Sequence, residues 1–365
     1  MANLLEKIEG ALLIEQDLQR CAELSARRAI YLSRIGRFAE VKEIIENLRL
    51  QYSDGHAPTI SVWIMLIEGV NDFFENLGDR AKDRITRAQL IGVAIGDRTL
   101  AAITSSWRAH IEFEVSDFES MAKALKICAE NLDEENHDAN ARFAMIIANC
   151  FFLRGDRESA QKWFMKSREI ALANGDQATI DALIYNRAAF GMARLRVERC
   201  LGPVNQQAVI SIRVELSSAR NYQKIARVGA VNHFVELCLA RVLMLEEKFD
   251  SALEALARIK TIGPFAAYNF SLALIDLESA YCLCKLGRYT EANESLESAF
   301  GDVFSGLDVD DRLVVAWLFA EIRNEKAGLI KFGHVEIDFQ AVSDEYTLMH
   351  ENLGNLVSAV VSDIS

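Results

Sequence analysis

The chain has 365 residues, of which 51% are hydrophobic and 25% are charged, and its formal net charge at pH 7 is −13. This composition is typical of a globular protein and excludes a disordered one. The negative charge disfavours direct binding of nucleic acid and of anionic membranes. Only three prolines interrupt the chain, so long helices can form through most of it, and we expect an all-α protein.

Residues 1–20 are predicted to form an N-terminal capping helix. Their apolar positions alternate with acids in a helical pattern, which is typical of an amphipathic helix and not of a signal peptide. No apolar run approaches the ~20 residues that span a bilayer. Most of the seven cysteines lie in apolar helical stretches, as expected of reduced core thiols. We therefore expect a cytoplasmic protein without membrane insertion.

Residues 21–300 contain a repeated pattern of a helix, a short turn and a second amphipathic helix. Equivalent turn positions fall 42, 38, 39, 92 and 40 residues apart, at Gly36, Gly78, Ser116, Gly155, Glu247 and Gly287. The spacing of 92 residues predicts one further hairpin around residues 182–200. A hairpin cannot bury its apolar face alone, so neighbouring hairpins must stack.

Each position of the pattern has a physical role. Glycine at the turn can adopt a positive φ and end the first helix. An aromatic residue follows two positions later and is expected to pack between the paired helices, at Phe38, Phe118, Phe249 and Tyr289. Small residues allow close approach of the backbones, at Ala29, Ala109, Ala148, Ala240 and Ala280 on first helices and at Ala160, Ala252 and Ala292 on second helices.

These segments resemble the tetratricopeptide repeat superfamily, most clearly in residues 153–176 (LRGDRESAQKWFMKSREIALANGD) and 284–300 (CKLGRYTEANESLESAF). The period near forty exceeds the usual value of about 34, and the family's proline after the second helix is missing. Second helices that end in Gly-Asp, at 96–97 and 175–176, resemble the long-repeat branch of bacterial signal-sensing regulators. The resemblance implies a right-handed superhelical solenoid of about eight to nine antiparallel helix hairpins.

Two regions depart from the repeat. The stretch LGPVNQQAVIS, which begins at Leu201, interrupts the helical pattern, and we expect a hinge near residues 200–210. Residues 301–365 are predicted to form a C-terminal helical cap or a connector to another module. Within them we expect a loop at 301–311, a helix at 312–329, a less helical segment at 331–346 with extended HVEIDF, and a final helix from 347.

No catalytic motif occurs in the sequence. Glycine-rich phosphate loops, nucleophile elbows and paired C-x-x-C clusters are absent. Cys282 and Cys284 are two residues apart in a predicted helix, where they point to different faces and cannot easily share a metal. The acidic run at 308–311 lacks the glycine and the final glutamate of a calcium loop. We therefore expect no enzymatic activity, no metal and no cofactor.

The first helices of such hairpins line the concave face, where a ligand would bind. Candidate side chains are Asn149, Arg142, Arg241, His110, Phe113, Phe152 and Tyr281. Asparagine can both donate to and accept from a peptide backbone, and arginine suits carboxylates. Packing between repeats is an alternative role for the aromatic residues, and pairing with an acid is an alternative role for the arginines.

A basic stretch spans residues 187–227. Its members are Arg187, Arg194, Arg196, Arg199, Arg213, Arg220, Lys224 and Arg227, against two acids in the same range. It could dock an acidic peptide or a phosphorylated partner. Alternatively, these cations pair with acids of the same chain.

The leading hypothesis is a scaffold or regulatory module for protein–protein interaction, which binds a peptide or protein segment on its concave face. Whether that partner is acidic is left open. The alternative is a regulatory domain that senses a ligand or signalling peptide and is coupled to an output module or partner. A subunit of a large assembly is a third interpretation, and a homodimer is left open.

Overall fold

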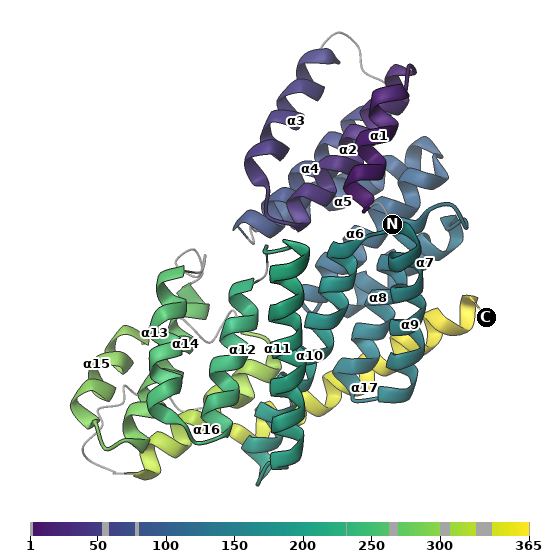
Figure 1. Ribbon diagram of the computed structural model, residues 1–365. Coiled ribbons are helices and arrows are strands. Elements are labelled where there is room, and N and C mark those ends of the chain that lie inside the picture. Colours follow the sequence, from purple (N-terminus) through teal and green to yellow (C-terminus); the bar gives the residue numbers. More distant parts are fainter. Residues whose placement is uncertain are drawn as a thin grey trace. The chain divides into compact units, whose positions relative to one another are not determined.

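A computed structural model describes residues 3–52, 58–76, 80–230, 232–262, 269–299, 307–325 and 338–364. Within these ranges every regular element is a helix, from α1 to α17 (Figure 1). The chain divides into two compact units. Unit 1 comprises residues 1–184, 222–230 and 353–365, and unit 2 comprises residues 185–221 and 231–352.

The described residues of unit 1 form nine whole helices, most of them paired in consecutive hairpins. Their bounds are α1 (Leu4–Ile14), α2 (Leu18–Arg34), α3 (Phe38–Gln51), α4 (Pro58–Asn76), α5 (Arg80–Ile95), α6 (Arg98–Glu114), α7 (Phe118–Asn131), α8 (His137–Arg154) and α9 (Arg157–Asn174). The hairpins α2/α3, α4/α5, α6/α7 and α8/α9 each join antiparallel neighbours (Figure 1).

The remaining helices are α10 (Gln177–Leu201), α11 (Gln206–Ala226), α12 (Asn232–Leu245), α13 (Phe249–Ile262), α14 (Asn269–Lys285), α15 (Tyr289–Ala299), α16 (Val309–Glu325) and α17 (Phe339–Ile364). In unit 2 the hairpins α12/α13 and α14/α15 continue the pattern, and α16 packs on α14. A cluster of apolar side chains joins α10 to α11 there. This pair is a further hairpin within the long spacing, but its predicted place around residues 182–200 is wrong, because those residues all lie in α10 and the turn falls at 202–205.

The predicted turns have the expected backbone. Gly36, Gly155 and Gly287 have φ values of 84°, 78° and 75°. At the equivalent turns Ser116 and Glu247 have φ values of 57° and 59°, a region that non-glycine residues rarely adopt. The shared left-handed residue therefore explains why these five turns are equivalent although their residue types differ.

The residue after the turn often caps the start of the next helix. Asp117 caps α7 and Asp156 caps α9, each accepting the backbone N–H of the third helical residue, as Asp97 does for α6 and Asn136 for α8. Such side chains replace a hydrogen bond that the first turn lacks. A left-handed residue followed by an N-cap thus ends one helix and begins the next within two positions at 116–117 and 155–156.

Close packing of paired helices uses the small residues, as predicted. Each of the eight alanines has a relative exposure of 0%: Ala29, Ala109, Ala148, Ala160, Ala240, Ala252, Ala280 and Ala292. The backbones of α4 and α5 also approach closely at Gly69, because a Cβ added there would lie 2.6 Å from Cγ1 of Ile85 on α5.

One prediction for the regions outside the repeat is wrong, and others stay untested. A break separates α10 from α11 at residues 202–205, but the division between the units falls inside α10 after Ile184; the hinge near 200–210 stays a prediction. The prediction of weak helicity at 339–346 is wrong, because Asp338 accepts the N–H groups of Gln340 and Ala341 and starts α17 early. Gly78, residues 301–306 and residues 331–337 lie outside the described residues.

Candidate functional site

A small cavity lies on the face of unit 1 that the first helices of successive hairpins share. This arginine cavity, of about 20 Å³, is lined by Arg27, Ile30, Tyr31 and Arg34 of α2, Trp63 of α4, Ile103 and Trp107 of α6, Asp138 and Arg142 of α8, and Leu4 and Ile8 of α1. Side chains from four consecutive first helices therefore meet at one point, which is how stacked hairpins form a shared surface.

Helix α1 closes one side of the arginine cavity. Its Leu4 and Ile8 are buried in a cluster with Leu24 and Tyr31 of α2. The backbone N–H of Leu4 donates to the carbonyl of Gly175 (3.0 Å), and Lys7 Nζ donates to the carbonyl of Asn174 (2.8 Å) at the end of α9. A cation at that position also interacts favourably with the helix dipole.

Two of the three arginines in this cavity have acidic partners. Arg27 donates to Asp138 Oδ2 (2.8 Å) and to Glu23 Oε1 (2.9 Å). Arg34 donates to Asp176 Oδ2 (2.9 Å), and both side chains of this pair are nearly inaccessible. Burial tends to raise the pKa of Asp176, but the charge of Arg34 and the hydrogen bonds from Thr179 and Arg34 together outweigh it, and the pKa is lowered. Asp176 therefore stays ionised and holds Arg34 in place.

Arg142 differs from these two. It is only 5% exposed, and its guanidinium carbon lies 3.5 Å from the centroid of the Trp107 ring. Among the described residues, no carboxylate forms an ion pair with Arg142 and no acceptor takes a hydrogen bond from it. A stacked ring stabilises the face of a guanidinium, whereas its N–H groups point outward from the edge and need acceptors.

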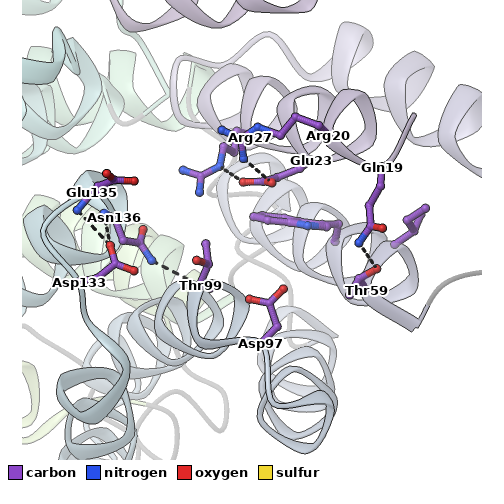
Figure 2. A pocket seen from close by; sticks show the side chains of 12 residues that line it. Gln19, Arg20, Glu23, Arg27, Thr59, Asp97, Thr99, Asp133, Glu135 and Asn136 are labelled. Atoms are coloured by element: carbon purple, nitrogen blue, oxygen red, sulfur yellow. Dashed lines mark hydrogen bonds and ion pairs between the residues drawn. The ribbon is translucent and has the colours of Figure 1, made fainter. Parts of the chain in front are cut away.

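A larger polar cavity, of about 230 Å³, adjoins the arginine cavity through Arg27 and Trp63, which line both. It is lined by Gln19, Arg20, Glu23 and Arg27 of α2, Thr59, Ile60 and Trp63 of α4, Asp97 and Thr99 at the start of α6, and Asp133, Glu135 and Asn136 before α8 (Figure 2). Figure 2 shows Arg20, Glu23 and Arg27 on one side and Asp133, Glu135 and Asn136 on the other.

Most acids of the polar cavity already have structural partners. Glu23 accepts from Arg20 (2.5 Å) as well as from Arg27. Asp97 accepts the N–H of Leu100, and Asp133 accepts the N–H of Asn136 (2.8 Å). Four carboxylates face two guanidinium groups around this cavity, so its potential favours neutral or cationic groups.

The candidate residues of unit 1 lie at different depths. Arg142 lines the arginine cavity. His110 contacts the edge of Trp107, with ring centroids 5.7 Å apart; burial, reinforced by the charges of Arg142 and Arg34, lowers the pKa of His110 to about 3, so it is neutral. Asn149 is buried two turns after Arg142, its Nδ2 has no partner among the described residues, and it lines neither cavity.

Phe113 and Phe152 pack inside their own hairpins. The ring of Phe113 lies 6.1 Å from that of Phe118 on α7, and the ring of Phe152 lies 6.2 Å from that of Phe164 on α9. These contacts lie within one hairpin, so the packing between repeats that the sequence left open stays a prediction. Neither residue lines the two cavities of unit 1.

Arg241 and Tyr281 belong to unit 2, where they line a cavity of about 40 Å³. Arg241 donates to Glu278 Oε1 (2.8 Å), and Tyr281 packs against Trp317 with ring centroids 5.4 Å apart. The predicted site residues are therefore distributed over two units, and their joint role in one groove stays a prediction.

The basic stretch forms several ion pairs. The pairs within unit 2 are Arg187–Glu215, Arg194–Glu198, Arg196–Glu278, Arg196–Asp311, Arg213–Glu246 and Arg220–Glu236. Arg199 lies over the Trp317 ring, with 5.2 Å to its centroid, and Lys224 and Arg227 are exposed. Most of these charges are thus neutralised locally, and docking of an acidic partner stays a prediction.

Sequence reasoning missed Trp63, Trp107 and Arg27. Each tryptophan carries an arginine from an adjacent first helix over its ring, at 5.8 Å for Arg27 over Trp63 and at 3.5 Å for Arg142 over Trp107. The two tryptophans are 44 positions apart in the sequence, close to the repeat period. That spacing in the sequence indicates that both tryptophans lie on the face that the first helices share.

Further features constrain the chemistry of the described residues. None of the seven cysteines, all of which lie in the described ranges, forms a disulfide, and five of them are buried. No group of three or more His, Cys, Asp or Glu side chains in the described ranges is arranged to hold a metal ion. Within the same ranges, no helix is both long and apolar enough to span a bilayer.

These helical hairpins define a tetratricopeptide-like fold. The structure is similar to a Rap protein solved in complex with competence and sporulation factor, with a TM-score of 0.57 and 15% sequence identity over 96% of this chain and 92% of that chain. A selenomethionine structure of phAimR matches with a TM-score of 0.45 and 10% identity, over 96% and 89%. No protein-family model and no curated protein matches the sequence. The likeness to the Rap protein confirms the predicted all-α, tetratricopeptide-like fold.

Proposed function

We propose that this chain is a regulatory protein that binds a peptide or a protein segment on the face of unit 1 formed by α2, α4, α6 and α8. The observation that carries the proposal is the pair of adjoining cavities, which share Arg27 and Trp63 and are lined by all four helices. A ligand that contacts several repeats at once can bias their arrangement, which is the basis of a regulatory response.

A binding role fits the state of the side chains better than a catalytic role. Asp97 and Asp133 accept backbone N–H groups, and Glu23 is shared by two arginines. General acid–base chemistry needs a carboxyl or imidazole group that is free to exchange a proton with a substrate. Three of the four carboxylates around the polar cavity, those of Glu23, Asp97 and Asp133, instead hold helix ends and arginines in place.

The likeness to the Rap protein, which was solved with a bound factor, supports the proposal through the fold alone. The charge of the polar cavity indicates which chemical groups of the ligand it can accept. Because four carboxylates outnumber two guanidinium groups there, the part of the ligand in this cavity is neutral or basic, and an acidic group fits only beside Arg142.

Short synthetic peptides of random sequence with free termini provide the test. The protein is incubated with the pool and separated from unbound peptide, and the retained peptides are identified by mass spectrometry. Their affinities are then measured for the wild type, for Glu135→Lys at the cavity and for Glu134→Lys, an exposed neighbour in the same loop that does not line it.

We expect Glu135→Lys to weaken binding by about threefold to tenfold, as one reversed charge at a solvent-facing site does, and Glu134→Lys to leave it unchanged. Retention of no peptide by the wild type, or equal effects of the two substitutions, would contradict a peptide site at the polar cavity.

A further inference from the structure

The inference concerns the chemical group that Arg142 receives, and it rests on the proposed function. Arg142 is 5% exposed and stacks on Trp107, which is 1% exposed. Arg27 and Arg34 line the same cavity and each donates to a carboxylate within 3 Å. Arg142 alone among these three has no acceptor in the described part of the chain.

A guanidinium that is only 5% exposed and has no acceptor within the described part of the chain is unfavourable, because its N–H groups keep only the small solvent contact that the cavity allows. Removal of one partner from a buried ion pair produces the same imbalance. The nearest acids, Asp138 and Asp176, are held by Arg27 and Arg34. The missing acceptor is therefore expected from outside the chain.

The space beside Arg142 selects among acceptors. A volume of about 20 Å³ admits one water-sized atom, so a single carboxylate oxygen can enter it, whereas a tetrahedral phosphate is bulkier. Leu4, Ile8, Ile30 and Ile103 provide apolar walls, which exclude water and strengthen a charge-assisted hydrogen bond.

We infer that Arg142 binds a carboxylate of the peptide ligand, while the residues next to that carboxylate lie in the polar cavity beyond Arg27 and Trp63. In that space one carboxylate oxygen can accept a charge-assisted hydrogen bond from the guanidinium. The carboxylate is supplied either by the C-terminus of the peptide or by an Asp or Glu side chain.

Three pools of short random peptides distinguish these sources with the intact wild-type chain. One pool has free C-termini and no Asp or Glu, the second has amidated C-termini and no Asp or Glu, and the third has amidated C-termini with Asp and Glu. Binding of the first pool but not the second identifies a terminal carboxylate. Binding of the third but not the second identifies a side-chain carboxylate.

Peptides retained from these pools are then tested on Arg142→Gln, which removes the charge, and on Arg84→Gln. Arg84 also lies in unit 1 but lines neither cavity and faces Glu68 and Asp72. We expect Arg142→Gln to weaken binding about tenfold to hundredfold, as loss of a charge-assisted hydrogen bond does. Arg84→Gln should not change it.

The outcomes separate the two proposals. If the amidated, acid-free pool binds as tightly as the others, or if Arg142→Gln keeps full affinity, the carboxylate assignment is wrong although a peptide still binds. If none of the pools binds, the proposed function fails together with the assignment. The comparison of pools needs only wild-type protein, so it decides the question even if Arg142→Gln does not fold.

Discussion

Replacement of Arg142 by methionine is expected to make the ligand-free protein more stable. Burial, reinforced by the charge of Arg34, lowers the pKa of Arg142 from 12.5 to about 9. At pH 7 the group is still protonated in both the folded and the unfolded state, so the full unfavourable energy of the buried charge is present. One pKa unit corresponds to about 1.4 kcal/mol, so the folded environment disfavours the guanidinium by about 5 kcal/mol.

Two effects offset part of this energy. The contact with Trp107 contributes about 2 kcal/mol when it is shielded from water. Methionine has a similar length, retains most of the apolar packing and can contact the ring through its sulfur. We therefore expect Arg142→Met to raise the free energy of unfolding by about 1–3 kcal/mol, within the range seen when apolar side chains replace buried charges.

Arg34→Met is the matched control, since it changes the same residue type in the same cavity. Here the substitution leaves Asp176 buried without its partner, and a loss of about 3–5 kcal/mol is expected. Urea unfolding at pH 7, followed by circular dichroism, measures both. A decrease of the unfolding free energy by Arg142→Met would contradict this prediction, because it would show that the guanidinium of Arg142 already has acceptors within the folded chain.

Two further predictions concern packing and pH. Gly69→Ala is expected to lower the unfolding free energy by about 1–3 kcal/mol, because the new Cβ would press on Ile85; Gly10→Ala, with nothing within 4 Å, should show no such loss, and equal effects in urea unfolding would contradict the packing argument. His110 has a folded pKa of about 3 against an ordinary 6.5, so the unfolded state binds more protons between these values and stability falls as pH decreases. From pH 7 to pH 5 this loss of unfolding free energy is about 2 kcal/mol. His110→Gln should reduce the change in unfolding free energy over this pH range by that amount. An unchanged pH profile of the variant would show that His110 is not neutral and buried in the folded protein.

The turns and the close contacts between helices could be predicted from the sequence because they depend on local chemistry. A left-handed turn at Gly155 is followed by Asp156, which caps the next helix, and this order is visible in the residue types. Ser116 and Glu247 show that the repeat phase identifies a left-handed position even without glycine.

The candidate site could be predicted only in part. Arg142 was found from its phase within the repeat, but its ring partner Trp107 lies 35 positions away and depends on how α6 and α8 are rotated against each other. Arg241 has the repeat position of Asn149, six residues before its turn, yet it lies in unit 2 and pairs with Glu278. The repeat pattern indicates which helix faces share a surface, and it does not show which cations on that surface already have partners.

Hydrogen–deuterium exchange of the wild-type protein, with and without a retained free-carboxyl peptide, tests the site most directly. Bound peptide should slow exchange in the first helices of unit 1, at residues 18–34 and 137–154, more than in the second helices at 38–51 and 118–131. Slower exchange confined to unit 2, with residues 137–154 unchanged, would contradict a ligand site beside Arg142.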